Sequence, residues 1–572
     1  MRYFCLVCDY DGTLAHDGKV SDTTIDALKR ARDSGRKLIL ATGRQWGDLL
    51  AVFPQLPIFD RVVAENGGLL CRPAEREKFP LARPPCLELV ARLKQYGVNP
   101  LSVGETIVAT WRPNETAALD AIRTLGLDLQ ITFNKDAVMI LPSGVNKGTG
   151  VRAALSELGF SPHNAVGIGD AENDHGFLEI CECNVAVQNA LPALKERADL
   201  VTGGARGAGV EQLIERLLAN DLIDLQPRLL RHSLALGKDP AGAPYGLQPY
   251  GTRLVVAGPS GSGKSTFISV LTEQLVEKEY QVCVIDPEGD YEDLEKFITL
   301  GRSGHQPGVS EILDVLEAHP RSVTVNLLGI PLPERPAFFQ KILASIQELR
   351  SRTGRPHWII IDEAHQLLPK SLDSASLVIP RDLSSTALVT VHPDHIAHPM
   401  LGSVNGLVLV GSNPSAVIAE FNSGVSVPLD GDLPQLAPLA HGEVIVWLFK
   451  MGAPPRKIAL APTRRERRRH RQKYAAGELG EDKSFYFRGP ALKLNLRAQN
   501  MNIFAQLAEG VDDDTWTHHL RQRDYSRWFR ESVKDAEVAA EIASIEADDS
   551  LTARESRERI LDLIRRKYTA PA

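Results

Sequence analysis

Four short stretches in the N-terminal third of the chain carry side chains that suit the cleavage of a phosphate ester. They are DYDGTL with Asp9 and Asp11, ATGR with Thr42, NKG with Lys147, and GDAEND with Asp170, Asn173 and Asp174. A carboxylate can attack phosphorus to give an aspartyl-phosphate, but it repels the phosphate dianion. A divalent cation held by carboxylates removes that repulsion, and an ammonium and a hydroxyl can hold phosphate oxygens. We therefore predict hydrolysis of a phosphate monoester, with Asp11 as the acid and base.

The elements expected around these residues place them at one edge of a sheet. Short β-branched runs such as FCLVC, KLILA and NAVGIG alternate with helical patterns, which is typical of a parallel sheet covered on both faces. Ligands bind at the carboxyl ends of the strands in such sheets. We expect an α/β, Rossmann-like domain over residues 1–222.

An inserted small α/β cap is expected at about residues 69–145, where the pattern changes to helix, strand, helix and two close strands. A closed cap leaves room for a small metabolite and disfavours a macromolecular substrate. Thr110, Trp111 and Arg112 are candidates for reading the leaving group, although Trp111 is expected to be ordinary core.

In order and spacing, the four stretches resemble the haloacid dehalogenase superfamily, and specifically its Cof-like phosphatases, over about residues 3–217. The compact cap is similar to that of members assigned to phosphoglycolate. The resemblance implies Asp9 as nucleophile, Asp11 as general acid and base, and Thr42 and Lys147 as phosphate holders. It also implies Mg²⁺, with Asp9, the backbone carbonyl of Asp11, Asp170 and Asp174 around it.

A second set of residues is suited to nucleotide phosphates. The stretch GPSGSGKST lies between an apolar strand pattern and a helical one, and it contains Gly258, Gly261, Gly263, Lys264, Ser265 and Thr266. Backbone N–H groups of such a loop surround phosphates, the lysine reaches the outer ones, and Ser265 ligates Mg²⁺. WIIIDEAH then predicts a buried strand that ends in Asp362, which would hold Mg²⁺ through water, and Glu363, which would polarise the attacking water. ATP is the expected ligand.

VCVIDPEGDY followed by IIIDEAHQL resembles the HerA and FtsK-like ATPases over about residues 251–450, within an expected α/β domain at 251–463. Those proteins commonly form hexamers that move nucleic acid or polypeptide, so the resemblance implies a homo-oligomer and leaves nucleic acid open as a partner. Arg381 is a candidate for the arginine that completes a neighbour's site. The sequence departs from the family where Thr390, Val391 and His392 replace a polar TQ pair, which puts γ-phosphate sensing in doubt.

The remaining segments carry weaker signals. A Pro/Gly-rich linker is expected at 223–250 and a basic linker at 464–485, where RRERRRHRQK lies. Residues 486–572 predict a helical module whose aromatic residues, Trp516, Tyr525, Trp528 and Phe529, form a core or docking face. The adjacent His518 and His519 point in different directions on a helix, which argues against a metal site.

Bulk properties narrow the class of protein. The 572 residues exceed what one core supports, so two or three domains are expected. The net charge of -7 gives no global reason to bind nucleic acid or an anionic membrane. Of the seven cysteines, Cys5 and Cys8 have CxxC spacing, but they lie in an apolar strand pattern where buried thiols are expected. The odd number of cysteines argues against a disulfide scaffold. The absence of an apolar run of membrane-spanning length favours a cytoplasmic chain with no membrane partner.

Three functional hypotheses follow. The leading one is a Mg²⁺-dependent phosphatase of a small phosphorylated metabolite, a phosphoric monoester hydrolase, joined to an ATPase domain that regulates it. The alternative is a HerA-like nucleic-acid ATPase or translocase with an accessory phosphatase. A polynucleotide end-healing enzyme is a third possibility, but the cap and the water-activating DEAH segment count against it.

Overall fold

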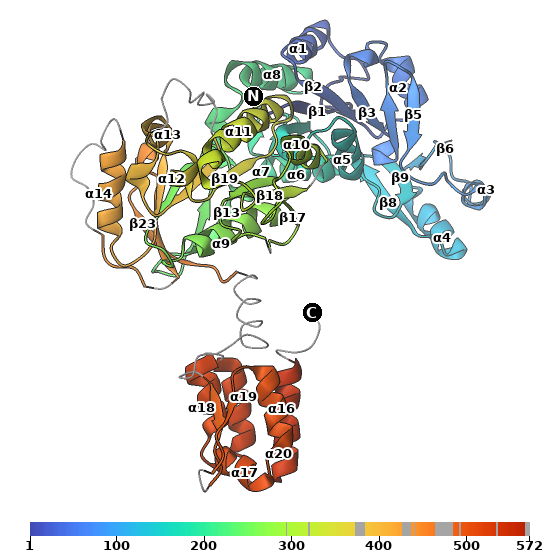
Figure 1. The fold of residues 1–572 in the computed structure, drawn as a ribbon. Helices are drawn as coiled ribbons and strands as arrows, with labels where there is room; N and C mark the ends of the chain where they lie inside the picture. The colour runs from blue at the N-terminus through green and yellow to red at the C-terminus, as the bar shows by residue number, and fades with distance from the viewer. Residues whose placement is uncertain are drawn as a thin grey trace. The chain divides into compact units, whose positions relative to one another are not determined.

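The computed structural model describes the chain except for residues 293, 319–320, 372–383, 426–435, 441, 464–483, 491–492, 534–535 and 567–572. The chain divides into two compact units, Met1–Ala461 and Pro462–Ala572. Figure 1 shows the first unit as two α/β parts, coloured blue to teal and green to orange, and the second unit in red. Among the described residues, no helix has the length and apolar character needed to cross a membrane.

The first α/β part is built on an eight-stranded sheet with the order β12-β11-β10-β1-β2-β3-β4-β5. Its strands are β1 (Cys5–Asp9), β2 (Lys37–Ala41), β3 (Arg61–Ala64), β4 (Leu69–Arg72), β5 (Glu77–Pro80), β10 (Ala165–Gly169), β11 (Cys183–Ala186) and β12 (Leu200–Val201). Its helices are α1 (Asp22–Asp33), α2 (Trp46–Val52), α5 (Lys147–Glu157), α6 (His175–Ile180), α7 (Pro192–Arg197) and α8 (Gly207–Asn220). The strands from β12 to β3 are parallel, and helices cover the sheet (Figure 1). All five residues of β1 are buried, as expected for a central strand covered on both faces.

The cap has a four-stranded antiparallel sheet of its own, with the order β6-β7-β9-β8. Its elements are α3 (Leu87–Gln95), β6 (Ser102–Val103), β7 (Val108–Trp111), α4 (Glu115–Leu125), β8 (Leu129–Asn134) and β9 (Ala137–Pro142). The two helices share a small core with one face of this sheet. The first hairpin of the segment expected to be the cap, β4 and β5, pairs with β3 and extends the main sheet instead. Backbone pairing with β3 therefore places the start of the separate cap sheet after that hairpin.

The stretch expected to be a linker, residues 223–250, is folded, so that prediction was wrong. It contains two short 3₁₀ segments and a hairpin of β13 (Leu234–Lys238) and β14 (Pro244–Leu247). β13 pairs with β23 (Arg456–Leu460) at an edge of the second sheet. Leu234, Leu236 and Leu247 are buried in the core of that second part. The alternate leucines of LALGK supply the buried face that a linker would lack.

The second α/β part has an eleven-stranded sheet with the order β14-β13-β23-β22-β21-β15-β20-β19-β16-β18-β17. Its other strands are β15 (Arg253–Ala257), β16 (Val282–Asp286), β17 (Phe297–Leu300), β18 (Ser322–Asn326), β19 (Trp358–Ile361), β20 (Thr386–Thr390), β21 (Gly406–Leu409) and β22 (Glu443–Trp447). Its helices are α9 (Lys264–Glu277), α10 (Val309–Glu317), α11 (Arg335–Thr353), α12 (Ala364–Leu367), α13 (His398–Ser403) and α14 (Pro414–Gly424). The strands from β21 to β17 are parallel, and two apolar clusters pack on opposite faces of the sheet.

The second unit is mainly helical. It contains β24 (Phe485–Phe487), β25 (Leu496–Ala498), α16 (Met501–Gly510), α17 (Asp513–Arg521), α18 (Asp524–Trp528), α19 (Ala536–Glu546) and α20 (Ala553–Ile564). The aromatic residues predicted to form a core do so, and Trp516, Tyr525 and Phe529 are fully buried. His519 Nδ1 lies 2.7 Å from Asp524 Oδ2, and its Nε2 accepts a hydrogen bond from the Arg488 backbone. The basic run at 464–473 lies outside the described residues.

Candidate active sites

The phosphatase candidates meet at the carboxyl edge of the first sheet. Asp9 is the last residue of β1, and Thr42 directly follows Ala41, which pairs with Asp9 across the β1–β2 ladder. Asp170 directly follows β10, and Lys147 is the first residue of α5. Oxygen atoms from Asp9, Asp170 and Asp174 lie within 4.8 Å of one another. The parallel register of the strands therefore assembles residues that are far apart in the sequence.

Lys147 holds two of these carboxylates together. Its Nζ donates to Asp9 Oδ1 at 2.5 Å and to Asp174 Oδ1 at 2.6 Å, and all three side chains are buried. Burial alone would lower the pKa of Lys147, but Asp174 and Asp9 outweigh burial and raise it. Lys147 is therefore a permanent cation at this site.

The carboxylates still carry excess negative charge after Lys147 is counted. Burial, followed by the charge of Asp174, raises the pKa of Asp9 above its usual range. Asp9 Oδ2 is buried and has no hydrogen-bond partner, whereas Asp174 Oδ2 accepts the backbone N–H groups of Asp170 and Ala171. An oxygen donor set with an orphaned carboxylate oxygen fits a hard divalent cation such as Mg²⁺.

Asp11 is paired with an arginine that the sequence interpretation did not select. Arg44 donates from Nε and Nη2 to the two oxygens of Asp11, each at 2.7 Å. Both side chains are about one-third exposed, with Asp11 at 35% and Arg44 at 30%. Arg44 lies in the ATGR stretch, in which only Thr42 was selected from the sequence as a site residue. A fork that matches a carboxylate so closely fixes the orientation of the predicted acid and base.

The cap residues proposed as readers of the leaving group serve other purposes. Thr110 is buried and donates to the Pro100 carbonyl, and Arg112 lies over the Phe133 ring at 5.0 Å. Trp111 is 53% exposed, so the expectation that it is core was wrong. Trp111 ends β7, next to the edge strand of the small cap sheet, and no second layer covers its side chain. The cap residue that reaches the carboxylates is Lys135, whose Nζ lies 3.1 Å from Asp170 Oδ2.

The nucleotide-site candidates form a strand, loop and helix as predicted. β15 ends at Ala257, and α9 begins at Lys264, so Ser265 and Thr266 lie in the first turn of the helix. Gly258, Gly261 and Gly263 have positive φ values. Lys264 Nζ donates to the carbonyls of Gly258 and Pro259 at 3.0 Å each. Burial lowers the pKa of Lys264, and Glu363 and Asp362 oppose that shift.

Asp362 and Glu363 follow β19, which is separated from β15 by β20 alone. Burial and then the charge of Glu363 raise the pKa of Asp362 to about 8. Thr390 ends β20, between the loop strand and the DE strand, and its Oγ1 lies 3.1 Å from His365 Nδ1. His365 Nδ1 is also 3.3 Å from Glu363 Oε2. His365 therefore connects Glu363 to Thr390, which lies where the related ATPases often have a polar TQ pair. Arg381 lies outside the described residues.

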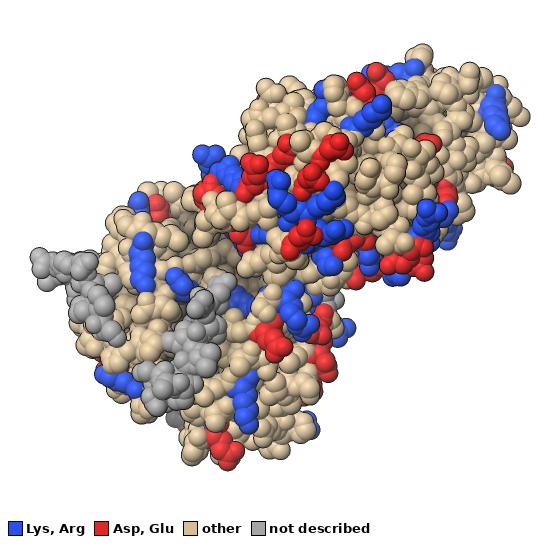
Figure 2. Space-filling view, turned by 90° about the horizontal axis from the view of Figure 1, so that it is seen from above, with Lys and Arg blue, Asp and Glu red and all other residues tan. Residues whose placement is uncertain are grey.

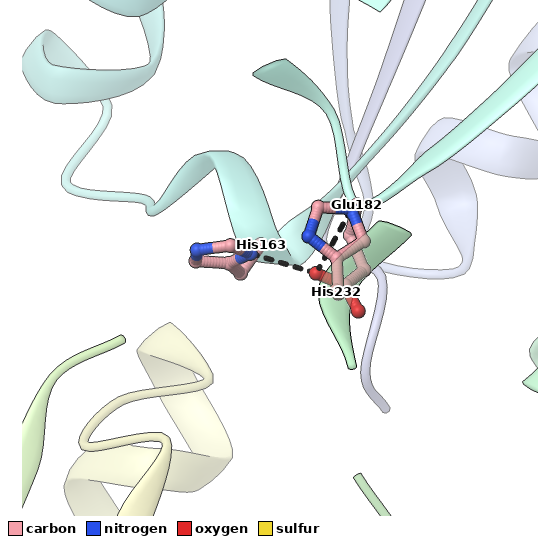
Figure 3. A group of neighbouring side chains, drawn as sticks. All are labelled: His163, Glu182 and His232. Carbon is pink, nitrogen blue, oxygen red and sulfur yellow. Dashed lines mark hydrogen bonds and ion pairs between the residues drawn. The ribbon is translucent and has the colours of Figure 1, made fainter. Parts of the chain in front are cut away.

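A third group of polar residues lies where the two α/β parts meet, and we call it the seam cluster: Arg2, His163, Glu182, His232 and Tyr280. All are buried except Arg2, whose side chain is 14% exposed. Figure 3 shows His163 and His232 pointing toward Glu182. Glu182 accepts hydrogen bonds from Arg2 Nη2 at 2.5 Å, Tyr280 Oη at 2.8 Å and His163 Nδ1 at 2.7 Å. His163 Nε2 lies 2.6 Å from the Lys278 carbonyl, in the second part.

The protonation of the seam cluster follows from its partners. The two ring nitrogens of His163 lie against Glu182 Oε2 and the Lys278 carbonyl, so the ring bridges the two α/β parts. Burial alone would raise the pKa of Glu182, but Arg2 and the His163 hydrogen bond hold it far below its usual range. The imidazole and carboxylate atoms lie close enough for a transition metal. Since Arg2 already supplies a counter-charge to Glu182 and His163 contacts both parts, we assign the cluster to joining the two parts.

Comparison with known proteins agrees with this geometry. The family of haloacid dehalogenase-like hydrolases matches residues 6–109 and 121–214, and the central domain of the helicase HerA matches 251–346. A phosphoglycolate phosphatase of Methanothermobacter thermautotrophicus is 29% identical over 219 residues, which are 37% of this chain and 98% of that protein. Phosphoglycolate phosphatase 2 of Saccharolobus solfataricus is 30% identical over 227 residues, 37% of this chain and 91% of that protein. The N-terminal part of this chain therefore belongs to the haloacid dehalogenase-like hydrolases, as a phosphoric monoester hydrolase, and a HerA-like domain follows it.

Proposed function

We propose that the protein is a Mg²⁺-dependent phosphatase of a small phosphorylated metabolite and works through an aspartyl-phosphate. The observation that carries this proposal is Asp9 Oδ2, a buried carboxylate oxygen without a partner beside Lys147, Asp170 and Asp174. The similarity to two phosphoglycolate phosphatases supports a small substrate. So does the cap, whose Lys135 reaches a catalytic carboxylate.

The residues divide the reaction between them. Asp9 Oδ2 bonds to phosphorus while the ester oxygen departs, and Asp11 gives that oxygen a proton. Asp11 then takes a proton from water, whose oxygen replaces Asp9 on phosphorus and yields inorganic phosphate. Lys147 and the Thr42 hydroxyl hold phosphate oxygens. Arg44 orients Asp11 in the resting site and must release one Asp11 oxygen before that oxygen can carry the proton that the leaving group receives. Mg²⁺, when bound by Asp9, Asp170 and the Asp11 carbonyl with Asp174 nearby, supplies charge neutralisation.

A substrate panel tests this proposal. Purified protein with Mg²⁺ is expected to release phosphate from at least one small phosphomonoester, and Asp9→Asn is expected to abolish that release. Asp17→Asn is the control, because Asp17 is exposed and lies on the loop that follows the same strand. Release that survives Asp9→Asn, or no release from any ester, would refute the assignment.

We further propose that the second part binds and hydrolyses ATP. Lys264 and Ser265 would hold the phosphates and Mg²⁺, Asp362 would support the metal, and Glu363 would orient water. The HerA-like match across the loop and the following strands supports this proposal. Lys264→Ala should remove ATP hydrolysis, and Lys278→Ala, at the far end of the same helix, should not. Equal ATP hydrolysis in both variants would argue against this site.

The seam cluster supports regulation of the phosphatase by the nucleotide. α9 runs from Lys264 at the loop to its C-cap, Lys278, whose carbonyl faces His163. β10 begins at Ala165, two residues beyond His163, and leads to Asp170. One helix and one strand therefore connect the two sites through His163. ATP is expected to change the phosphate-release rate of the wild type and not that of Glu182→Gln, while Glu279→Gln keeps the response.

A nucleic-acid translocase remains the second candidate, because the HerA match is to a helicase domain. On the face shown in Figure 2, basic and acidic side chains are interspersed, and the described residues there form no stripe of one sign. DNA should therefore leave ATP hydrolysis unchanged if the metabolite phosphatase is the main activity. Stimulation by DNA that Lys264→Ala abolishes would favour the translocase. Sizing the protein with and without ATP would test the proposed homo-oligomer, for which the resemblance suggests a hexamer.

A further inference from the structure

One cap lysine lies over the catalytic carboxylates without belonging to any of the four motifs. β8 and β9 are joined by a two-residue turn, Lys135–Asp136, and Asn134 pairs with Ala137 at its base. Lys135 Nζ lies 3.1 Å from Asp170 Oδ2. The Lys135 side chain is 52% exposed and that of Asp170 only 2%. The lysine is thus a solvent-accessible cation that reaches into a buried acidic site.

The backbone at this position does not favour lysine. Lys135 has φ of 54°, in the left-handed region that glycine and asparagine adopt most readily in two-residue hairpins. A side chain kept at such a position points to a use for it, since strained residues gather at ligand sites. The turn conformation orients the Lys135 side chain toward Asp170.

The other described cations of the site are fully engaged. Lys147 is buried between Asp9 and Asp174, and Arg44 uses two nitrogens on Asp11. Lys135 instead shares Asp170, a carboxylate that the proposed Mg²⁺ would also use. A divalent cation there would repel the ammonium from Asp170, and Lys135 would then be free to bind an anion of the substrate.

The substrate can supply that anion. In-line attack by Asp9 places the leaving group on the side of phosphorus away from Asp9. Lys135 is the cap side chain that reaches this site. Resting on the proposed phosphatase function, we propose that Lys135 binds a carboxylate on the leaving group. The names of the similar phosphoglycolate phosphatases already indicate a small phosphomonoester with a carboxylate, and the inference concerns the residue that binds this carboxylate.

Binding to an inactive protein tests this assignment without turnover. In the Asp9→Asn background with Mg²⁺, calorimetry would compare 2-phosphoglycolate with 2-hydroxyethyl phosphate, in which a neutral hydroxymethyl group replaces the carboxylate. Lys135→Met should weaken binding of 2-phosphoglycolate by about tenfold or more, the usual loss for a charge-assisted hydrogen bond. Binding of 2-hydroxyethyl phosphate should barely change.

Three further variants complete the test. Lys94→Met removes a cap lysine from α3, the helix on the outer face of the cap sheet, and should change neither affinity. Lys135→Arg should retain most of the preference for the carboxylate. Lys135→Gly should melt at the same or a higher temperature, since glycine accepts the positive φ, and yet lose the preference.

Outcomes separate this inference from the function on which it rests. If the wild type hydrolyses phosphomonoesters but Lys135→Met affects both ligands equally, or neither, the role of Lys135 is overturned and the phosphatase stands. If the wild type hydrolyses no member of the panel, both are overturned. A selective loss for 2-phosphoglycolate that Lys135→Arg restores supports the inference.

Discussion

Asp170 is the residue on which the phosphatase geometry depends most closely. One of its oxygens is 3.4 Å from Thr13 Oγ1 and the other 3.1 Å from Lys135 Nζ, so it is approached from both the core and the cap. Gly12 passes beside it with φ of 89°, and a Cβ at Gly12 would lie 2.3 Å from Asp170 Oδ2. The glycine of DYDGTL is therefore required for space as well as for backbone conformation.

Gly12→Ala is expected to displace Asp170 and lower the phosphatase rate by about 100-fold, the usual cost of a misplacement near 1 Å. Gly35→Ala is the matched control, because Gly35 has φ of 91° and nothing within 4 Å of a built Cβ. Both variants should lose about 1 kcal/mol of stability from the strained φ, and only Gly12→Ala should lose activity. Thermal melting and phosphate release measured together would show this, and equal activity in the two variants would contradict it.

Motif residues and their neighbours differ in how far the sequence reveals them. Asp9, Thr42, Lys147 and Asp170 follow buried strands or begin a helix, so periodicity alone places them at one sheet edge. Arg44 was within a quoted motif, and an arginine beside a predicted acid and base could have been selected for its charge. Lys135 could not have been selected from the sequence, because its contact with Asp170 depends on how the cap packs on the core.

At the scale of elements, the hairpin β13–β14 shows why composition misleads. Its Gly and Pro residues match those of a linker, and the leucines that identify it as a strand are few. Gly237 lies where β13 meets β23, and a Cβ there would be 2.0 Å from the Ala459 carbonyl. The same glycine that suggested flexibility allows a close approach between strands. The antiparallel edge formed by β13, β23 and β22 thus needs a chain segment that precedes the nucleotide loop.

Gly237→Ala is expected to push β13 from β23 and to destabilise the second α/β part by about 2 kcal/mol, a typical cost of overpacking. Gly402→Ala, in α13 with no atom within 4 Å of its built Cβ, should be neutral or slightly stabilising. Chemical denaturation would compare the unfolding free energies of the two variants. Thermal melting with and without ATP would show whether the second α/β part is the one that is destabilised. A stable Gly237→Ala variant would mean that the hairpin does not support the sheet.

At the scale of the whole first unit, the two sheets meet through the amino ends of their strands. His163 and Glu182 precede β10 and β11, and Gln281 and His357 precede β16 and β19. Both candidate sites lie at the opposite ends of these strands. The arrangement leaves each site open to its own substrate while the seam cluster joins their supporting elements. The sequence motifs do not reveal this connection between the two sheets, because each polar residue of the seam cluster lies outside them.

The buried histidines at the seam predict that the stability of the folded protein depends on pH. His357 Nδ1 accepts the Gln281 N–H, and burial, with the nearby His163, keeps the pKa of His357 well below 6.5. Burial likewise lowers the pKa of His232 to about 4, against the pull of Glu182. Both histidines stay neutral in the folded protein while the unfolded chain takes up protons, so stability present above about pH 6.5 is lost as the pH falls. The charged and titratable groups facing this region are Arg2, His163, Glu182, Arg231, Lys278, Arg350 and Arg355.

His357→Asn keeps an acceptor for Gln281 without a titrating ring. Between about pH 7.5 and pH 5, the wild type should lose about 2 kcal/mol more unfolding free energy than this variant, as expected for one buried neutral histidine. Denaturation midpoints at the two pH values would measure the difference. His16→Asn is the control because its ring is exposed. An unchanged pH dependence in His357→Asn would exclude His357 as its source.

Glu182 offers the strictest test of whether the two α/β parts act as one. Glu182→Ala leaves the mostly buried Arg2 without its counter-charge, which typically costs about 3–5 kcal/mol, and leaves His163 Nδ1 without its partner. Glu279→Ala breaks a separate ion pair between the two parts, Arg152–Glu279, whose side chains are about half exposed and which is worth at most about 1 kcal/mol. Binding of ATP in the second part should slow hydrogen exchange in β10 of the wild type and of Glu279→Ala. In Glu182→Ala the protection should stop at α9, because the helix then lacks its contact with an ordered His163. Protection of β10 that persists in Glu182→Ala would show that coupling does not pass through the seam cluster.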